Sequence, residues 1–202
     1  MRSILPRLRS VPAILLLGSA AVSAAGQSAI VSHWTFDPQL LLARSDTVMR
    51  KAPESAIDEL FQAVRHASTK PEELALMCAF FDPGSRHDLA AVNQAALQFS
   101  PDSQRRFQRA TDRLLQVHEQ EPDQPYDDAV ARQSLRQAAV AAGMLFEGFV
   151  AAIQSEGRDA ASRQARCRAL NQLLGTVSMR PRNERVMITR LLMREGLRRI
   201  ER

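Results

Sequence analysis

The stretch AAVAAGMLFEGFVAAI, residues 138–153, favours a helix that other helices surround. Its 16 residues are mostly alanine and large apolar side chains, and Glu147 is the one charged residue among them. A helix that is apolar on all sides is generally buried, because a surface helix keeps one polar face. The stretch is short for a membrane span, which needs about 20 apolar residues. We therefore expect it at the centre of a helical bundle, in one long helix or two consecutive helices over 127–155.

The rest of the sequence also predicts helices. Apolar residues recur at helical spacing, as in Ile57, Leu60, Phe61 and Val64. Helix starts are marked by proline or a capping residue near Pro38, Pro53, Pro71, Ser85, Pro101, Asp127, Asp159 and Pro181. Strand alternation is absent except for a possible irregular or extended segment at 26–36. The sequence predicts an all-α, single-domain bundle of about seven or eight helices over 26–202.

The N-terminal residues 1–25 have the pattern of a cleaved signal peptide. Arg2, Arg7 and Arg9 precede an uncharged apolar run at 11–22, and small residues follow it. Cleavage is expected near Ala24 or Ala25, which makes the mature chain periplasmic or secreted. The chain has 25 arginines and only two lysines, as expected from a GC-rich bacterial genome. Removal of three arginines leaves 24 basic and 22 acidic residues, a balance that gives no reason to expect nucleic-acid binding.

Cys78 and Cys167 are the only two cysteines, and both lie in the expected mature chain. An even number of cysteines in an oxidising compartment favours a disulfide. Each cysteine also shares a helical face with apolar residues, so both sulfur atoms should point inward from two different helices. The alternative is a pair of free buried thiols. We predict a Cys78–Cys167 disulfide.

Two places invite a chemical interpretation. His87-Asp88 resembles part of a metal or hydrolase site, but Asp88 follows Ser85 by three residues and so fits the capping box of a new helix. Glu147 lies in the most apolar stretch and could be a buried acid, although exposure or pairing with an arginine is the more common state. No familiar hydrolase, metal or phosphate-loop motif occurs. We therefore predict no catalytic residue, no metal site and no cofactor.

Charge is distributed unevenly along the chain. Residues 158–202 hold 12 arginines and 4 acidic residues, whereas residues 26–157 hold 12 basic and 18 acidic residues. A stripe with four-residue spacing runs along the last helix: Arg190, Arg194, Arg198 and Arg202. It either packs on the acidic part of the chain or forms a docking face for an anionic partner.

These features favour an exported bacterial binding protein of the inhibitor, immunity or envelope-adaptor type, with the arginine stripe as its contact surface. Its partner would be another envelope or secreted protein, or an anionic surface, and the mature chain would have no transmembrane span. One alternative is a hydrolase of an unfamiliar helical class. Another is a lipid or small-molecule carrier, in which aromatic residues would line a cavity: Phe80, Phe81, Phe146 and Phe149.

Overall fold

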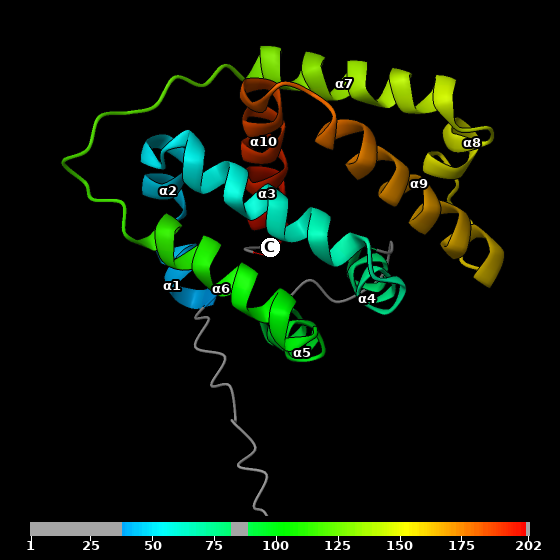
Figure 1. Cartoon of the computed structure of the whole chain (residues 1–202), viewed down its shortest axis with the longest axis horizontal. Helices are drawn as coiled ribbons and strands as arrows, with labels where there is room; N and C mark the ends of the chain where they lie inside the picture. Colours follow the sequence, from blue (N-terminus) through cyan, green and yellow to red (C-terminus); the bar gives the residue numbers. More distant parts are fainter. Residues whose placement is uncertain (1–37, 82–88, 201–202) are drawn as a thin grey trace, which may run out of the picture. The chain divides into compact units, whose positions relative to one another are not determined.

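The computed structural model describes residues 38–81 and 89–200, which belong to one compact unit, Ser32–Arg202. Within these ranges every regular element is a helix (Figure 1). The helices are α1 (Pro38–Ala43), α2 (Ser45–Lys51), α3 (Glu54–Ser68), α4 (Pro71–Phe81), α5 (Leu89–Leu97), α6 (Pro101–Leu115), α7 (Asp128–Leu145), α8 (Phe149–Ile153), α9 (Ala160–Ser178) and α10 (Arg182–Ile200). The all-α prediction is confirmed. The signal peptide, the segment 26–36, His87-Asp88 and Arg202 lie outside the described residues.

The described ranges contain more helices than the seven or eight expected, because short helices flank two of the predicted ones. Helix α2 is not predicted from the sequence, whereas α7 and the five-residue α8 are the two consecutive helices that were one of the alternatives for 127–155. Most other boundaries follow local signals. Ser100 accepts a hydrogen bond from the Ser103 N–H at the start of α6, and Asp127 and Asp159 accept equivalent bonds at α7 and α9.

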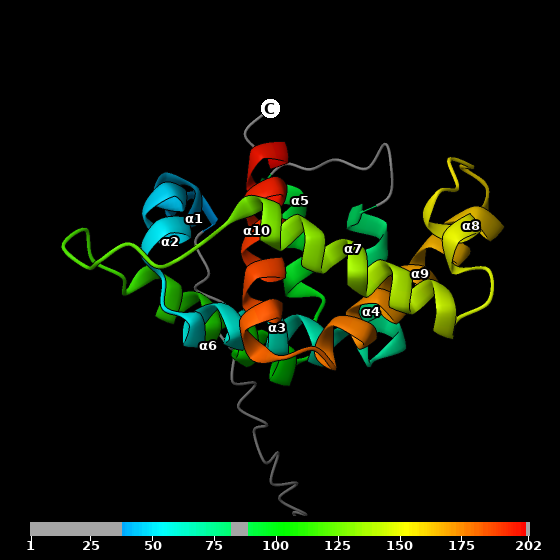
Figure 2. The same cartoon turned by 90° about the horizontal axis from the view of Figure 1, so that it is seen from above.

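The centre of the fold is α3, and not the apolar stretch of 138–153. Helices α4, α6, α9 and α10 all contact α3. Two core clusters meet along it: Ile57 packs with Val48, Leu114 and Val186, and Phe61 packs with residues of α4, α7, α9 and α10. Figures 1 and 2 show α7 and α9 side by side in opposite directions, with α8 beyond the end of α7. The prediction that 138–153 is surrounded by helices is wrong, because Val140 and Met144 in this stretch are 63% and 83% exposed.

The long connection between α6 and α7 is held by polar side chains of α2 and the residue before it. Arg44 donates to the carbonyl oxygens of Leu115 and Val117, which are left without helical partners at the end of α6. Lys51 donates to the Glu121 carbonyl at 2.5 Å and lies 3.1 Å from a carboxylate oxygen of Asp123. These contacts fix α2 against the α6–α7 connection.

The predicted disulfide agrees with the geometry of the structure. The Sγ atoms of Cys78 in α4 and Cys167 in α9 lie 2.05 Å apart, and their Cα atoms lie 5.3 Å apart. The bond closes a loop with a sequence separation of 89 and ties two neighbouring helices together. The sulfurs are therefore part of the scaffold and do not form a thiol site.

Candidate functional site

The arginine stripe is not a continuous exposed face of α10. Arg190 is only 2% exposed, and its guanidinium donates to the carbonyl oxygens of Met49, at 2.7 Å, and Ala52. Arg194 pairs with the carboxylate of Asp128 and lies over the ring of Tyr126, 5.3 Å from its centroid. The prediction of an exposed docking stripe is therefore wrong at Arg190, and Arg194 is also engaged internally.

The four-residue spacing explains why the arginines of the stripe do not share one exposed face. Each step of four residues turns about 40° further around a helix of 3.6 residues per turn. Arg190 therefore faces the core, whereas Arg198 is exposed and lies 3.8 Å from a carboxylate oxygen of Glu195. The alternative of internal packing holds for much of the basic C-terminal part, since Arg185 also pairs with Asp58. Contact of Arg198 or Arg202 with a partner stays a prediction.

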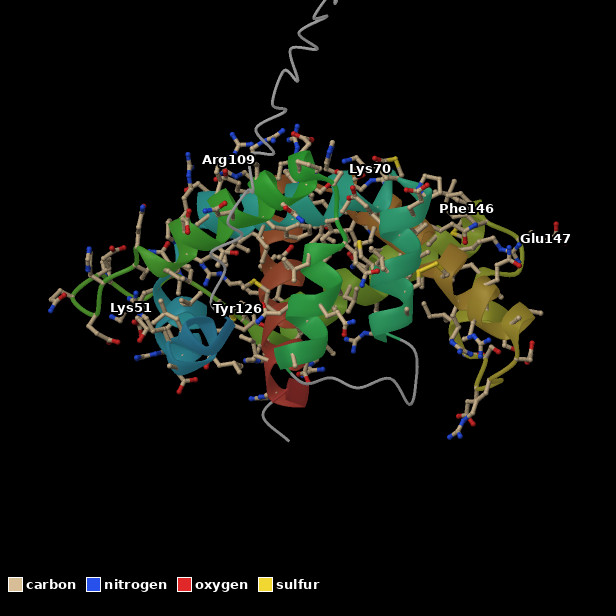
Figure 3. The ribbon with its side chains drawn as sticks, turned by 90° about the horizontal axis from the view of Figure 1, so that it is seen from below. Lys51, Lys70, Arg109, Tyr126, Phe146 and Glu147 are labelled. Carbon is tan, nitrogen blue, oxygen red and sulfur yellow. A yellow bond between two sulfur atoms is a disulfide. The ribbon has the colours of Figure 1, made fainter. Side chains whose placement is uncertain are left out.

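A cluster of hydrogen-bonded polar side chains joins α4 to the start of α6. The Nζ of Lys70 lies 3.2 Å from Oε1 of Glu73, 2.8 Å from Oγ of Ser100 and 2.9 Å from Oγ of Ser103. The same Glu73 oxygen accepts the Ser100 N–H at 3.1 Å. Glu73 thus supplies the anion that a helix N-terminus favours. Lys70 is among the side chains labelled in Figure 3.

Lysine beside serine hydroxyls is an arrangement in which a neutral amine can activate a nucleophile. Here the Nζ of Lys70 donates to three acceptors, the carboxylate of Glu73 and the hydroxyls of Ser100 and Ser103. Ser103 is fully buried, so no substrate reaches its hydroxyl. The cluster therefore anchors α4 to α6, and its geometry does not favour a catalytic role.

This anchor leads to a prediction about pH. Glu73→Gln should lower the free energy of unfolding at about pH 7 by about 1–3 kcal/mol, because Ser100 and Lys70 lose a charged acceptor. Burial raises the pKa of Glu73, but hydrogen bonds from Ser100, Ser103 and Lys70 outweigh it and hold that pKa below its ordinary value of 4.5. The carboxylate therefore stabilises the fold above the unfolded-state pKa and loses this contribution as the pH falls through the folded-state pKa.

Urea unfolding of the wild type and Glu73→Gln, at about pH 7 and about pH 3, measures the effect. The difference between the two proteins should shrink at the acidic pH. Glu72→Gln is the matched control, because Glu72 is exposed in the same first turn of α4. Equal losses for the two variants at pH 7 would contradict the assignment of Glu73 as the anchor.

A turn at residues 146–148 separates the end of α7 from α8. Phe146 takes an extended conformation after Leu145, and Gly148 has a φ of 76°, a left-handed conformation that glycine adopts without strain. The chain then turns into α8. Phe149, which is buried, packs with Ala142 of α7 and Ala169 of α9 and so fixes the short helix.

Large apolar side chains are exposed on both sides of this turn. Five of them, which we call the α7–α8 apolar surface, are between 45% and 83% exposed: Val140, Met144, Leu145, Val150 and Ile153. A Cβ added at Gly143 would lie 3.3 Å from Cγ2 of Val150, so Val150 of α8 lies against Gly143 of α7. In monomeric soluble proteins, contiguous exposed apolar patches that are large often mark contact sites.

A groove runs beside this surface, between α8 and α9. It has a volume of about 440 Å³ and is lined mainly by small residues, including Gly148, Ala151 and Ala152 on the α8 side and Ala161 and Ala165 on the α9 side, where Arg168 also lines it. Of the aromatic residues predicted to line a carrier cavity, Phe149 contributes to the groove, but its ring is almost fully buried. Phe146 is half-buried, and the side chains of Phe80 and Phe81 are outside the described part.

Arginines cluster near the start of α9. Arg166 donates to the carbonyl oxygens of Ser155, at 3.1 Å, and Gly157, at 2.6 Å. Arg163 donates to the carbonyl of Arg158, and Arg168 lines the groove. In the part of the chain that the structure describes, no carboxylate forms an ion pair with Arg158, Arg163 or Arg168. Among the described residues, their positive charge therefore has no direct ion-pair partner.

Glu147 is exposed in the turn between α7 and α8, and it lines one mouth of the groove. Figure 3 shows its side chain directed away from the helices, near Phe146. The exposed state is the one that the sequence favours for this residue, and an exposed carboxylate without a neighbouring base is a poor acid catalyst. The sequence does not predict the α7–α8 apolar surface, because a helix that is apolar on all sides is generally buried.

Three negative findings complete the description of the site. Within 38–81 and 89–200, no three side chains of the metal-binding types come together as ligands. None of the described helices combines the length and the apolar character needed to cross a bilayer. The sequence and the structure were also compared with known proteins: no protein-family model, no curated protein and no solved structure matches the chain.

Proposed function

We propose that the protein is an exported binding protein of the bacterial envelope, of the inhibitor, immunity or adaptor type, and that it binds through the α7–α8 apolar surface. The observation that carries the proposal is the exposure of five large aliphatic side chains on two adjacent helices. Exposing them to water costs free energy that a contact would recover, at about 25 cal/mol for each Å² of apolar area covered.

The polar clusters support binding over catalysis. The Lys70 cluster is satisfied internally, and the carboxylate of Asp58 is engaged by Arg185 through two hydrogen bonds of 3.1 Å. A catalytic group needs a free reactive atom within reach of a substrate. The clusters around Lys70 and Asp58 instead hold helices together, whereas the α7–α8 apolar surface is open to a partner.

The test is capture from the host envelope with a tagged protein. Met144→Glu/Leu145→Glu should abolish the capture of a stoichiometric envelope component, because two carboxylates would have to be buried in the contact. Leu97→Glu is the matched control, since Leu97 is 62% exposed on α5 and is not part of the α7–α8 apolar surface. Circular dichroism checks that both variants remain folded. Capture that persists in the double variant would contradict the proposal.

A further inference from the structure

We infer that the partner of the α7–α8 apolar surface is an anionic lipid bilayer, which the aliphatic side chains enter while arginines near the start of α9 contact the headgroups. This inference rests on the proposed function and names the occupant of the same surface. It depends on three properties of the described residues: the chemistry of the exposed side chains, the position of α8 and the distribution of charge around it.

The exposed side chains suit hydrocarbon better than a protein pocket. In protein interfaces, binding energy is concentrated in tryptophan, tyrosine and arginine, whereas valine and leucine are under-represented among the residues that contribute most. Among the residues whose side chains are described, the large apolar ones that are exposed include no aromatic residue. Aliphatic chains gain from transfer into lipid without a complementary shape, because the acyl chains rearrange around them.

The position of α8 allows shallow insertion. Its main contacts are with α7 and α9, and Figures 1 and 2 place it at the end of these two helices, away from α2 and α6. Interfacial helices bury their apolar face about 5–10 Å into the boundary between headgroups and acyl chains. Side chains such as Met144 and Ile153 can reach this depth while the polar turn stays among the headgroups.

The charge near α8 favours phosphate headgroups. Arg158, Arg163 and Arg168 have no carboxylate in an ion pair within the part of the chain that is described, and all three are exposed. Glu147 and Glu156 are the opposing exposed charges. Asp159 is a third carboxylate in this region, and it keeps its negative charge because it accepts from the N–H and the hydroxyl of Ser162.

Lipids suit this mixture of charges better than a fixed acidic surface does. Headgroups diffuse laterally, so anionic lipids can gather at the arginines and leave Glu147, Glu156 and Asp159 facing zwitterionic neighbours. A rigid acidic protein surface would have to meet both signs of charge in one fixed arrangement. Each basic residue near an anionic bilayer contributes about 1 kcal/mol, which is about a fivefold change in partition.

The experiment measures co-sedimentation of residues 26–202 with vesicles. One set contains phosphatidylglycerol and phosphatidylethanolamine, and the other contains phosphatidylcholine alone. We expect at least about tenfold stronger partition into the anionic vesicles, and a loss of that preference at high salt. Met144→Glu/Leu145→Glu should lower binding to both vesicle types at least about tenfold, since each leucine-sized side chain contributes this much when buried.

Two further variants separate the two contributions. Arg158→Glu/Arg168→Glu should lower binding to the anionic vesicles at least about fivefold and leave the weak binding to phosphatidylcholine unchanged. Leu97→Glu should bind like the wild type. If the wild type binds neither vesicle, or if the apolar double variant binds as well as the wild type does, the lipid inference is overturned.

The outcomes also separate this inference from the proposed function. Capture of an envelope protein that is lost in Met144→Glu/Leu145→Glu, with no vesicle binding, overturns the lipid partner and leaves a binding protein. A concentration-dependent dimer that the same double variant abolishes, again without vesicle binding, would make a second copy the occupant of the surface. If the double variant retains both capture and vesicle binding, both proposals are overturned.

Discussion

Arg190→Ala should lower the free energy of unfolding by about 3 kcal/mol or more. The guanidinium is almost fully buried and donates to the carbonyl oxygens of Met49 and Ala52, at the end of α2. The alanine variant leaves these two acceptors unsatisfied and opens a cavity between α10 and α2, and each effect costs about 1–3 kcal/mol. Guanidinium chloride unfolding of the wild type and the variant measures the loss.

Arg198→Ala is the matched control on the same helix. Its side chain is 55% exposed, and its ion pair with Glu195 is on the surface, so the change should stay within about 0.5 kcal/mol. Arg190→Lys tests the geometry, because a lysine keeps the charge but cannot reproduce the fork that reaches two carbonyl groups. Similar stability of the Arg190→Ala and Arg198→Ala variants would contradict the assigned role of Arg190.

Removal of the disulfide by Cys78→Ala/Cys167→Ala should lower the free energy of unfolding by about 4–5 kcal/mol. The loop between the cysteines spans 89 positions, and its closure restricts the unfolded chain strongly. Denaturant unfolding of the oxidised wild type, the reduced wild type and the double variant measures the effect. The reduced wild type should resemble the variant.

A reducing agent should leave the cysteine-free variant unchanged, which controls for effects of the agent on the rest of the protein. A double variant that is as stable as the oxidised wild type would show that the bond contributes nothing. A variant with native far-ultraviolet circular dichroism but an early unfolding transition would agree with the expected role, because the bond links α4 to α9 and restricts the unfolded chain.

Local signals in the sequence were enough to predict most helices. Proline at Pro53, Pro71 and Pro101 marks helix starts that the structure reproduces within a residue or two, because proline at these positions costs no helical hydrogen bond. Buried faces were also readable, as for Ile57 in α3 and Leu174 in α9. The disulfide could be predicted from the even number of cysteines and from the apolar helical face on which each one lies, although the sequence does not give the distance between them.

Long-range packing could not be predicted in the same way. In the sequence of α10, nothing distinguishes Arg190 from Arg198. Arg190 is buried because it lies against the end of α2, whereas Arg198 is exposed. The Lys70 cluster likewise joins residues 30 or more positions apart. For 138–153, composition describes an apolar helix, but it does not say whether protein or something else covers its outer face.

The position of α10 has a consequence for the order in which the protein can be made. This helix follows the other described helices in the chain, yet it contacts α2, α3 and α7 and supplies Val186 and Ile188 to two core clusters. Until it emerges from the ribosome, Ile57 and Phe61 lack part of their covering and the carbonyl groups at the end of α2 lack Arg190. The two core clusters along α3 therefore cannot be completed during synthesis before α10 has left the ribosome.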